Sequence, residues 1–140
     1  MKTFFTLCLL ISFMIASAQV GELNIDGIVY GSNGLPMKQV KVSVLNASGD
    51  HVQEKVTAAN GQFAFSLAFG QKWDIVMQKA GHAPKKVVFD TRPVTKEYQA
   101  YVYEYGGFRV TLYSGDDKES PQAVGHIIFD PESQTFIQAP

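Results

Sequence analysis

The sequence predicts an all-β domain. Apolar and polar residues alternate with a period of two along most of the chain, and helical periodicity is hard to find. Glycine and proline fall between the alternating runs, where turns are expected. Six such runs follow one another within about seventy residues, a spacing typical of a β-sandwich or a β-barrel.

The strands can be placed one by one from the alternation. In residues 38–45 three valines share one face while Lys41 and Ser43 share the other. Residues 115–122 are expected to be a polar loop, and residues 131–140 a loosely held tail. The expected strands are residues 23–31, 38–45, 51–57, 62–67, 72–78, 85–91 and 123–130, with two more in 96–114 on either side of Gly106-Gly107.

The apolar face of each run supplies the expected core. Large aliphatic and aromatic side chains at every second position are typical of strands with one face buried. The expected core includes Val29, Val40, Val42, Val44, Val56, Phe63, Phe65, Trp73, Ile75, Val87 and Phe108.

The Asn60-Gly61 pair predicts a β-hairpin. Both residues accept the positive φ that a type I′ turn requires, and alternating apolar residues follow. With a two-residue loop Val56 pairs with Phe65, and Val52 lies on the same buried face. A four-residue loop would keep the same faces. No lysine, serine or threonine follows at the spacing of a phosphate-binding loop, so a nucleotide site is not expected here.

Residues 1–18 have the features of a secretory signal peptide. An early lysine and an apolar run too short to cross a membrane end in three small residues of the type that signal peptidase accepts. We expect cleavage after Ala18 and export to the periplasm, the cell surface or the medium. The single cysteine, Cys8, lies in this segment, so the mature chain is expected to have no disulfide and no thiolate.

The mature chain is expected to form one domain. Its 122 residues (140 − 18) are enough for one hydrophobic core, with residues 19–92 as the main part and 93–140 completing it. Its formal charge is close to neutral, −2 from 11 basic and 13 acidic residues, which argues against binding of nucleic acid. No second apolar run is long enough to span a membrane.

Four short motifs occur in order between residues 26 and 91. They are a G-x-V strand at Gly27, a G-x-P-[LM] turn at Gly34, a T-x-x-x-G-x-F stretch at Thr57 and a K-x-G turn at Lys79. In this order they resemble the carboxypeptidase regulatory-like domain. The rest of the chain, with its Gly-Gly-Phe strand, resembles short secreted Bacteroidetes proteins that carry this domain.

This resemblance implies a Greek-key β-sandwich of the transthyretin (prealbumin) type, with seven or more strands. It also implies a non-catalytic accessory or binding module. Hydroxyisourate hydrolases share the transthyretin-like fold, but they end in a Tyr-Arg-Gly-Ser signature, whereas this chain ends in "FIQAP".

No constellation of catalytic or metal-binding residues is evident. His51, His82 and His126 lie on separate strands or turns, so no metal site is expected. Asp116-Asp117 lacks the alternating oxygen ligands of a calcium loop. There is no G-x-S-x-G nucleophile motif. We therefore expect no enzymatic activity, no catalytic residues and no cofactor.

Three tyrosines are the candidate binding residues. Tyr101, Tyr103 and Tyr105 share one face if their strand is regular, and a row of tyrosines offers flat apolar area with hydroxyl groups for a sugar or a protein. The alternative is that they pack across strands. The main hypothesis is a secreted, non-enzymatic module that interacts with another envelope or secreted protein. The alternative is a carbohydrate-binding module that uses these tyrosines on an exposed face.

Overall fold

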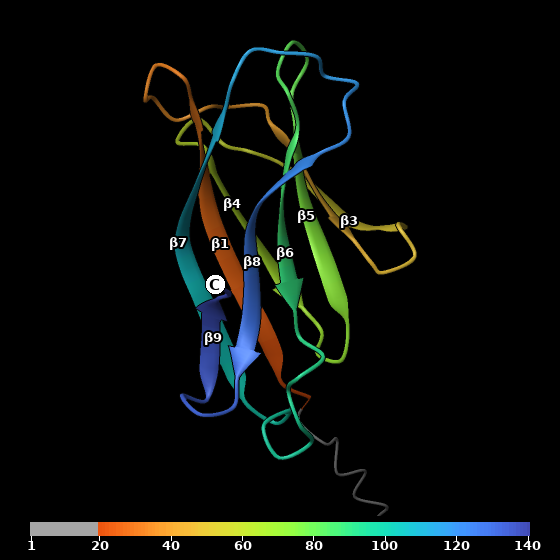
Figure 1. Ribbon diagram of the computed structural model, residues 1–140. Helices are drawn as coiled ribbons and strands as arrows, with labels where there is room; N and C mark the ends of the chain where they lie inside the picture. The colour runs from red at the N-terminus through yellow and green to blue at the C-terminus, as the bar shows by residue number, and fades with distance from the viewer. Residues whose placement is uncertain (1–19) are drawn as a thin grey trace, which may run out of the picture.

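The computed structural model describes residues 20–140, and this part of the chain is built from strands and turns without any helix (Figure 1). The expected signal peptide lies outside the described residues. Within residues 20–140 the structure has no helix with the length and hydropathy that a membrane crossing requires. The strands are β1 (Glu22–Gly31), β2 (Lys41–Leu45), β3 (His51–Val56), β4 (Gln62–Leu67), β5 (Lys72–Gln78), β6 (Lys85–Asp90), β7 (Val102–Leu112), β8 (Gln122–Asp130) and β9 (Thr135–Gln138).

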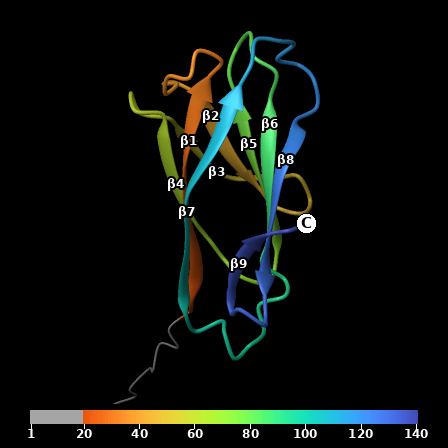
Figure 2. The ribbon, with the colours of Figure 1, turned by 60° about the vertical axis from the view of Figure 1, so that its left-hand side comes forward.

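The strands form two sheets packed face to face. The smaller sheet has the order β4-β1-β7 and the larger one β3-β2-β5-β6-β8-β9. Figure 2 shows the two layers from the side, with β1, β4 and β7 in one and β5, β6 and β8 in the other. Most pairs are antiparallel, but β1 pairs with β7 and β6 with β8 in parallel. The all-β sandwich with seven or more strands is therefore confirmed.

The two sheets enclose one core. The inner faces of β1 and β4 supply Leu23, Ile25 and the two phenylalanines of β4, which meet apolar residues of the larger sheet. Each fully buried side chain of this size stabilises the fold by about 1.5–3 kcal/mol relative to exposure. Ten of the eleven expected core residues belong to this cluster or pack against it. The exception is Val56.

The expected hairpin between residues 51 and 67 is wrong. β3 pairs with β2 and β4 pairs with β1, so the chain crosses from one sheet to the other between them. Val52 and Val56 are 50% and 61% exposed. The reason is that β3 is an edge strand of the larger sheet, and the residues that it turns toward the smaller sheet are Gln53 and Lys55. The valine alternation therefore marks the solvent face.

A turn nevertheless forms here, but it is not the expected type I′ turn, because only Gly61 of the Asn60-Gly61 pair has a positive φ. Gly61 has a φ of 72°, and its N–H donates to the carbonyl of Ala58 over 2.9 Å. Thr57, which begins the crossing, is buried. Its hydroxyl donates to the Met37 carbonyl over 2.7 Å and accepts the Val40 N–H over 3.0 Å. The T-x-x-x-G stretch thus fixes a connection between the two sheets rather than a hairpin.

Two expectations for the C-terminal part are also corrected. Residues 102–112 form one strand, β7, and Gly106-Gly107 make a bulge in it where the pairing with β1 shifts register. The expected loose tail contains β9, which pairs with β8 and buries Phe136. Because this part supplies strands to both sheets, residues 93–140 belong to the same sandwich as the residues before them.

Candidate functional site

The three tyrosines do not form one exposed row. Tyr101 lies at a bend before β7 and is 59% exposed. Tyr103 and Tyr105 are partly buried and point into the sandwich, where they pack against the core. The ring of Tyr103 has its centroid 5.5 Å from that of Phe129, and Tyr105 lies 5.7 Å from Phe89, both in edge-to-face geometry.

Packing also changes the chemistry of Tyr103. Burial raises the pKa of its hydroxyl above the usual value, and the neighbouring Tyr98 and Tyr101 raise it further. Its ring belongs to an aromatic cluster that closes one end of the sandwich, with Phe69, Phe129 and Phe136. The second and third tyrosines of the expected ladder therefore have a packing role in this structure.

The other chemistry-bearing residues lie apart from one another. Within residues 20–140, no three His, Asp or Glu side chains come together in a way that could hold a metal ion. The Asp117 carboxylate accepts the Gly81 N–H over 2.9 Å, so it fixes the loop of residues 115–121 onto a neighbouring turn. Ser43 is completely buried on β2, and its hydroxyl has no hydrogen-bond partner in the described part of the chain.

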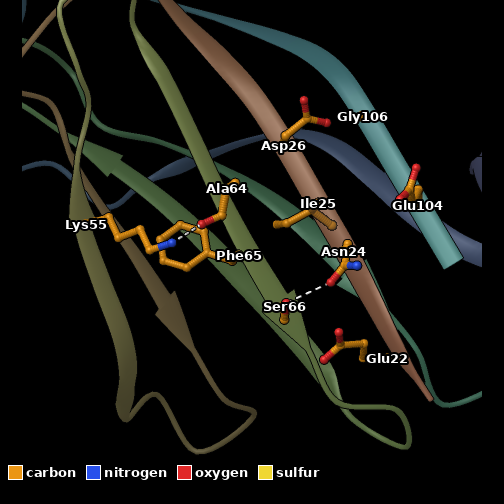
Figure 3. A pocket seen from close by; sticks show the side chains of 10 residues that line it. All are labelled: Glu22, Asn24, Ile25, Asp26, Lys55, Ala64, Phe65, Ser66, Glu104 and Gly106. Atoms are coloured by element: carbon orange, nitrogen blue, oxygen red, sulfur yellow. Dashed lines mark hydrogen bonds between the residues drawn. The ribbon is translucent and has the colours of Figure 1, made fainter. Parts of the chain in front are cut away.

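A concave surface, here called the groove, lies on the outer face of the smaller sheet (Figure 3). It has a volume of about 560 Å³ and is open to solvent. Its floor combines side chains of β1, β4 and β7, which lie side by side in rows across the sheet. It is lined by Glu22, Asn24, Ile25, Asp26, Lys55, Ala64, Phe65, Ser66, Glu104 and Gly106.

The register explains why the groove is hollow. Ala64 lies beside Asp26 on one flank, and the Gly106-Gly107 bulge lies on the other. A Cβ at Gly106 would lie against the Asp26 carboxylate, so a larger residue at this position would require that carboxylate to move. The same carboxylate accepts the Gly107 N–H over 3.1 Å and thereby holds the bulge. Small residues on both sides thus leave space above the middle of β1.

Carboxylates dominate the charge of the groove. Glu22 and Asp26 come from β1 and Glu104 from β7, whereas Lys55 reaches in from β3 as the single cation among the lining residues. The Ser66 hydroxyl donates to the side-chain oxygen of Asn24 over 2.7 Å, so the serine is engaged with an amide and not with a base. Three carboxylates and one ammonium group make this surface suited to holding cationic or hydrogen-bonding groups.

Sequence reasoning missed this groove. The polar residues of β1 at positions 22, 24 and 26 alternate with buried ones, which was a usable signal for a solvent face. The contribution of Glu104 required the parallel pairing of β1 with β7, which brings it beside Asn24. Nothing local in the sequence indicates that pairing.

Comparison with known proteins gives limited functional information. No curated protein matches the sequence. Among solved structures, 3-chlorocatechol 1,2-dioxygenase from Rhodococcus opacus 1CP matches with 12% identity and a TM-score of 0.47, over 71% of this chain and 62% of that one. Catechol 1,2-dioxygenase from Acinetobacter sp. ADP1 matches with 13% identity and a TM-score of 0.46, over 78% and 60%.

A third similar structure is the dioxygenase domain of a dioxygenase carbohydrate-binding protein fusion from Streptomyces sp. SirexAA-E. It has 16% identity and a TM-score of 0.47, over 71% of this chain and 84% of that one. The present chain spans less than two thirds of the length of the first two dioxygenases. Similarities at this level give no information on the activity of this chain.

A family model gives the clearest assignment. It describes a protein of unknown function, DUF1416, and it matches residues 13–101. The matched segment is more than half of the 140-residue chain and ends just before β7. The chain therefore belongs to the DUF1416 family.

Proposed function

We propose that this protein is an exported, non-enzymatic β-sandwich module that binds another envelope or secreted protein through the groove on its smaller sheet. The observation that carries the proposal is the row of carboxylates over β1 and β7 in an open groove. The partner that this surface fits is an extended polypeptide segment that carries lysine or arginine. Such a segment can lie along the sheet and pair its cations with Glu22 and Glu104.

The form of the groove supports a polypeptide partner over a small substrate. Small-molecule sites are usually enclosed and mostly apolar, whereas this groove is open and polar. A sugar site would favour exposed aromatic rings, and of the three candidate tyrosines only Tyr101 is largely exposed. The carbohydrate-binding alternative thus receives no support from the packing of Tyr103 and Tyr105.

The proposed accessory role also draws on the resemblance of residues 26–91 to the carboxypeptidase regulatory-like domain, whose members are usually non-catalytic modules. Export to the periplasm or beyond rests on the signal-like features of residues 1–18. The intact mass of the protein purified from its native host should correspond to a chain that begins at Gln19. A chain that retains Met1 to Ala18 would contradict export by this signal.

The binding proposal is tested by replacing two of the three carboxylates that line the groove, Glu22 and Glu104. Glu22 and Glu104 are neighbours on β1 and β7. We expect the Glu22→Gln/Glu104→Gln variant to lose a partner that the mature wild-type chain retains from an envelope extract. Asp26 is left unchanged because it holds the β7 bulge. Retention should weaken as salt is added, since exposed charge pairs are screened. Chemical cross-linking followed by mass spectrometry identifies the partner and the segment that lies in the groove.

Glu54→Gln is the matched control. Glu54 is an exposed carboxylate on β3, in the larger sheet, where it pairs with Lys41 and does not line the groove. The control variant should retain the partner as the wild type does. Equal retention by all three proteins would exclude the groove as the binding site. Binding of a glycan in an array, abolished by Tyr101→Ala and not by the carboxylate variant, would favour the carbohydrate-binding module instead.

A further inference from the structure

The free edge of β4 is covered by side chains from the other sheet. Among the described residues 20–140, β4 is at the edge of the smaller sheet, with β1 as its single neighbour. The Lys55 ammonium group donates to the Ala64 carbonyl over 2.6 Å, as Figure 3 shows, and the Gln53 amide donates to the Ser66 carbonyl over 3.0 Å. Lys55 also lies 5.1 Å from the ring centroid of Phe65. Two side chains of β3 thus donate hydrogen bonds to two successive outward-facing carbonyls of β4, those of Ala64 and Ser66.

These acceptors are the groups that another strand would need. Residues of an antiparallel strand alternate between bonding their neighbour and facing away from it. The Val29 N–H donates to the Gly61 carbonyl, so the odd-numbered residues of β1 and β4 bond each other. Ala64 and Ser66 therefore face the free edge. An uncovered row of such groups is a template for pairing with a further chain.

The sequence of β4 is well suited to pair with a second copy of itself. In an antiparallel pair centred on Ala64, that residue lies opposite its own copy and Gln62 lies opposite Ser66 on the outer face. Phe63 lies opposite Phe65 on the inner face. No charges oppose each other, because residues 62–67 contain no charged side chain. Aromatic cross-strand pairs of this kind stabilise a sheet.

The edge of β3 is less suited to self-pairing. An antiparallel pair of two β3 strands centred on Glu54 places the two carboxylates directly opposite each other, which is unfavourable. A pair centred on Lys55 does the same with two ammonium groups. The charges of β3 therefore disfavour association at its own edge, while two of its side chains cover the edge of β4.

We propose that Gln53 and Lys55 keep the protein from associating with a second copy of itself through β4. Removing both side chains exposes the carbonyls of Ala64 and Ser66 and opens this edge to antiparallel pairing. The two smaller sheets then become one continuous sheet across two molecules. This inference concerns self-association and does not depend on the proposed partner of the groove.

The test compares the molar mass of wild type and variants by sedimentation over a range of protein concentrations. We expect Gln53→Ala/Lys55→Ala to double its molar mass as concentration rises, while the wild type remains monomeric. Glu54→Ala is the control on the same strand and should also remain monomeric, because Glu54 pairs with Lys41 and not with β4. Circular dichroism establishes that each variant is folded.

A third substitution tests whether β4 is the contact. Ala64→Lys, added to the double variant, places two ammonium groups opposite each other at the centre of the pair, and the dimer should be lost. Ala64 is exposed, so a lysine there is compatible with the fold. The inference is overturned if the folded double variant stays monomeric, if the wild type dimerises equally, or if the triple variant is still a dimer.

Discussion

Phe129→Ala is expected to lower the free energy of unfolding by about 3–5 kcal/mol, the usual effect of removing a buried phenylalanine. The side chain is 2% exposed, on the inner face of β8. Its ring contacts those of Tyr98, Tyr103 and Phe136, with centroid separations of 5.7, 5.5 and 5.4 Å. The substitution therefore leaves a cavity and weakens the attachment of β9. Equilibrium unfolding in urea measures the loss.

Tyr113→Ala provides a comparison for this variant. Tyr113 is also aromatic, but it is 53% exposed and lies outside the aromatic cluster. Its replacement should change stability by much less. Hydrogen exchange gives a second measurement, because the amides of β9 should lose protection in Phe129→Ala. A variant as stable as the wild type would show that the aromatic cluster does not anchor the C-terminal strands.

Gly61→Ala should be the most damaging glycine substitution among the turns with positive φ. A left-handed backbone costs an alanine about 1–2 kcal/mol. Here the new methyl group would also lie 2.5 Å from the backbone carbonyl of Val29, and relieving such a clash typically costs a further 1–3 kcal/mol. The Gly61 carbonyl accepts the Val29 N–H, so displacement of the turn also disturbs β1. Chemical denaturation measures the loss of stability.

Gly34→Ala is a matched control for the backbone term. Gly34 has a φ of 76°, close to that of Gly61, but an added Cβ would have no neighbour within 4 Å. The difference in stability between the two variants therefore isolates the clash with β1. If both variants lose the same stability, the turn at Gly61 relaxes without strain, and its close approach to Val29 has no energetic consequence.

The existence of strands was predictable, whereas their partners were not. The strand at 62–67 was placed correctly because alternation and turn residues are local properties. The turn signal at Asn60-Gly61 was also local, and the structure has a turn there, although Asn60 lacks the positive φ of type I′. Whether such a turn joins neighbours in one sheet or crosses between two depends on where the flanking strands find partners. Those partners, β1 and β2, precede both flanking strands in the sequence.

The burial of the tyrosines also depends on residues that lie far away in the sequence. That Tyr103 and Tyr105 share a face follows from the period of two and agrees with their burial. The face of β7 that points inward is the one that aromatic rings of other strands cover. For Tyr103 these include Phe129 and Phe136, which are more than twenty residues further along the chain. The polar residues of β7, such as Glu104, were the better indication of the solvent side.

The parallel pairing of β1 with β7 has a consequence for how the chain can be divided. The central strand of the smaller sheet is the first of the described strands, and one of its two neighbours follows 80 residues later, since Leu23 pairs with Tyr103 (103 − 23). Contacts of such long range form slowly, because the intervening chain must first be closed into a loop. A fragment that stops at residue 101, where the family match ends, lacks this neighbour and also lacks β8 beside β6. Truncation at the match boundary would leave β1 and β6 each without one of their neighbours, so we expect the segment matched by the family model to be too short to fold as this sandwich.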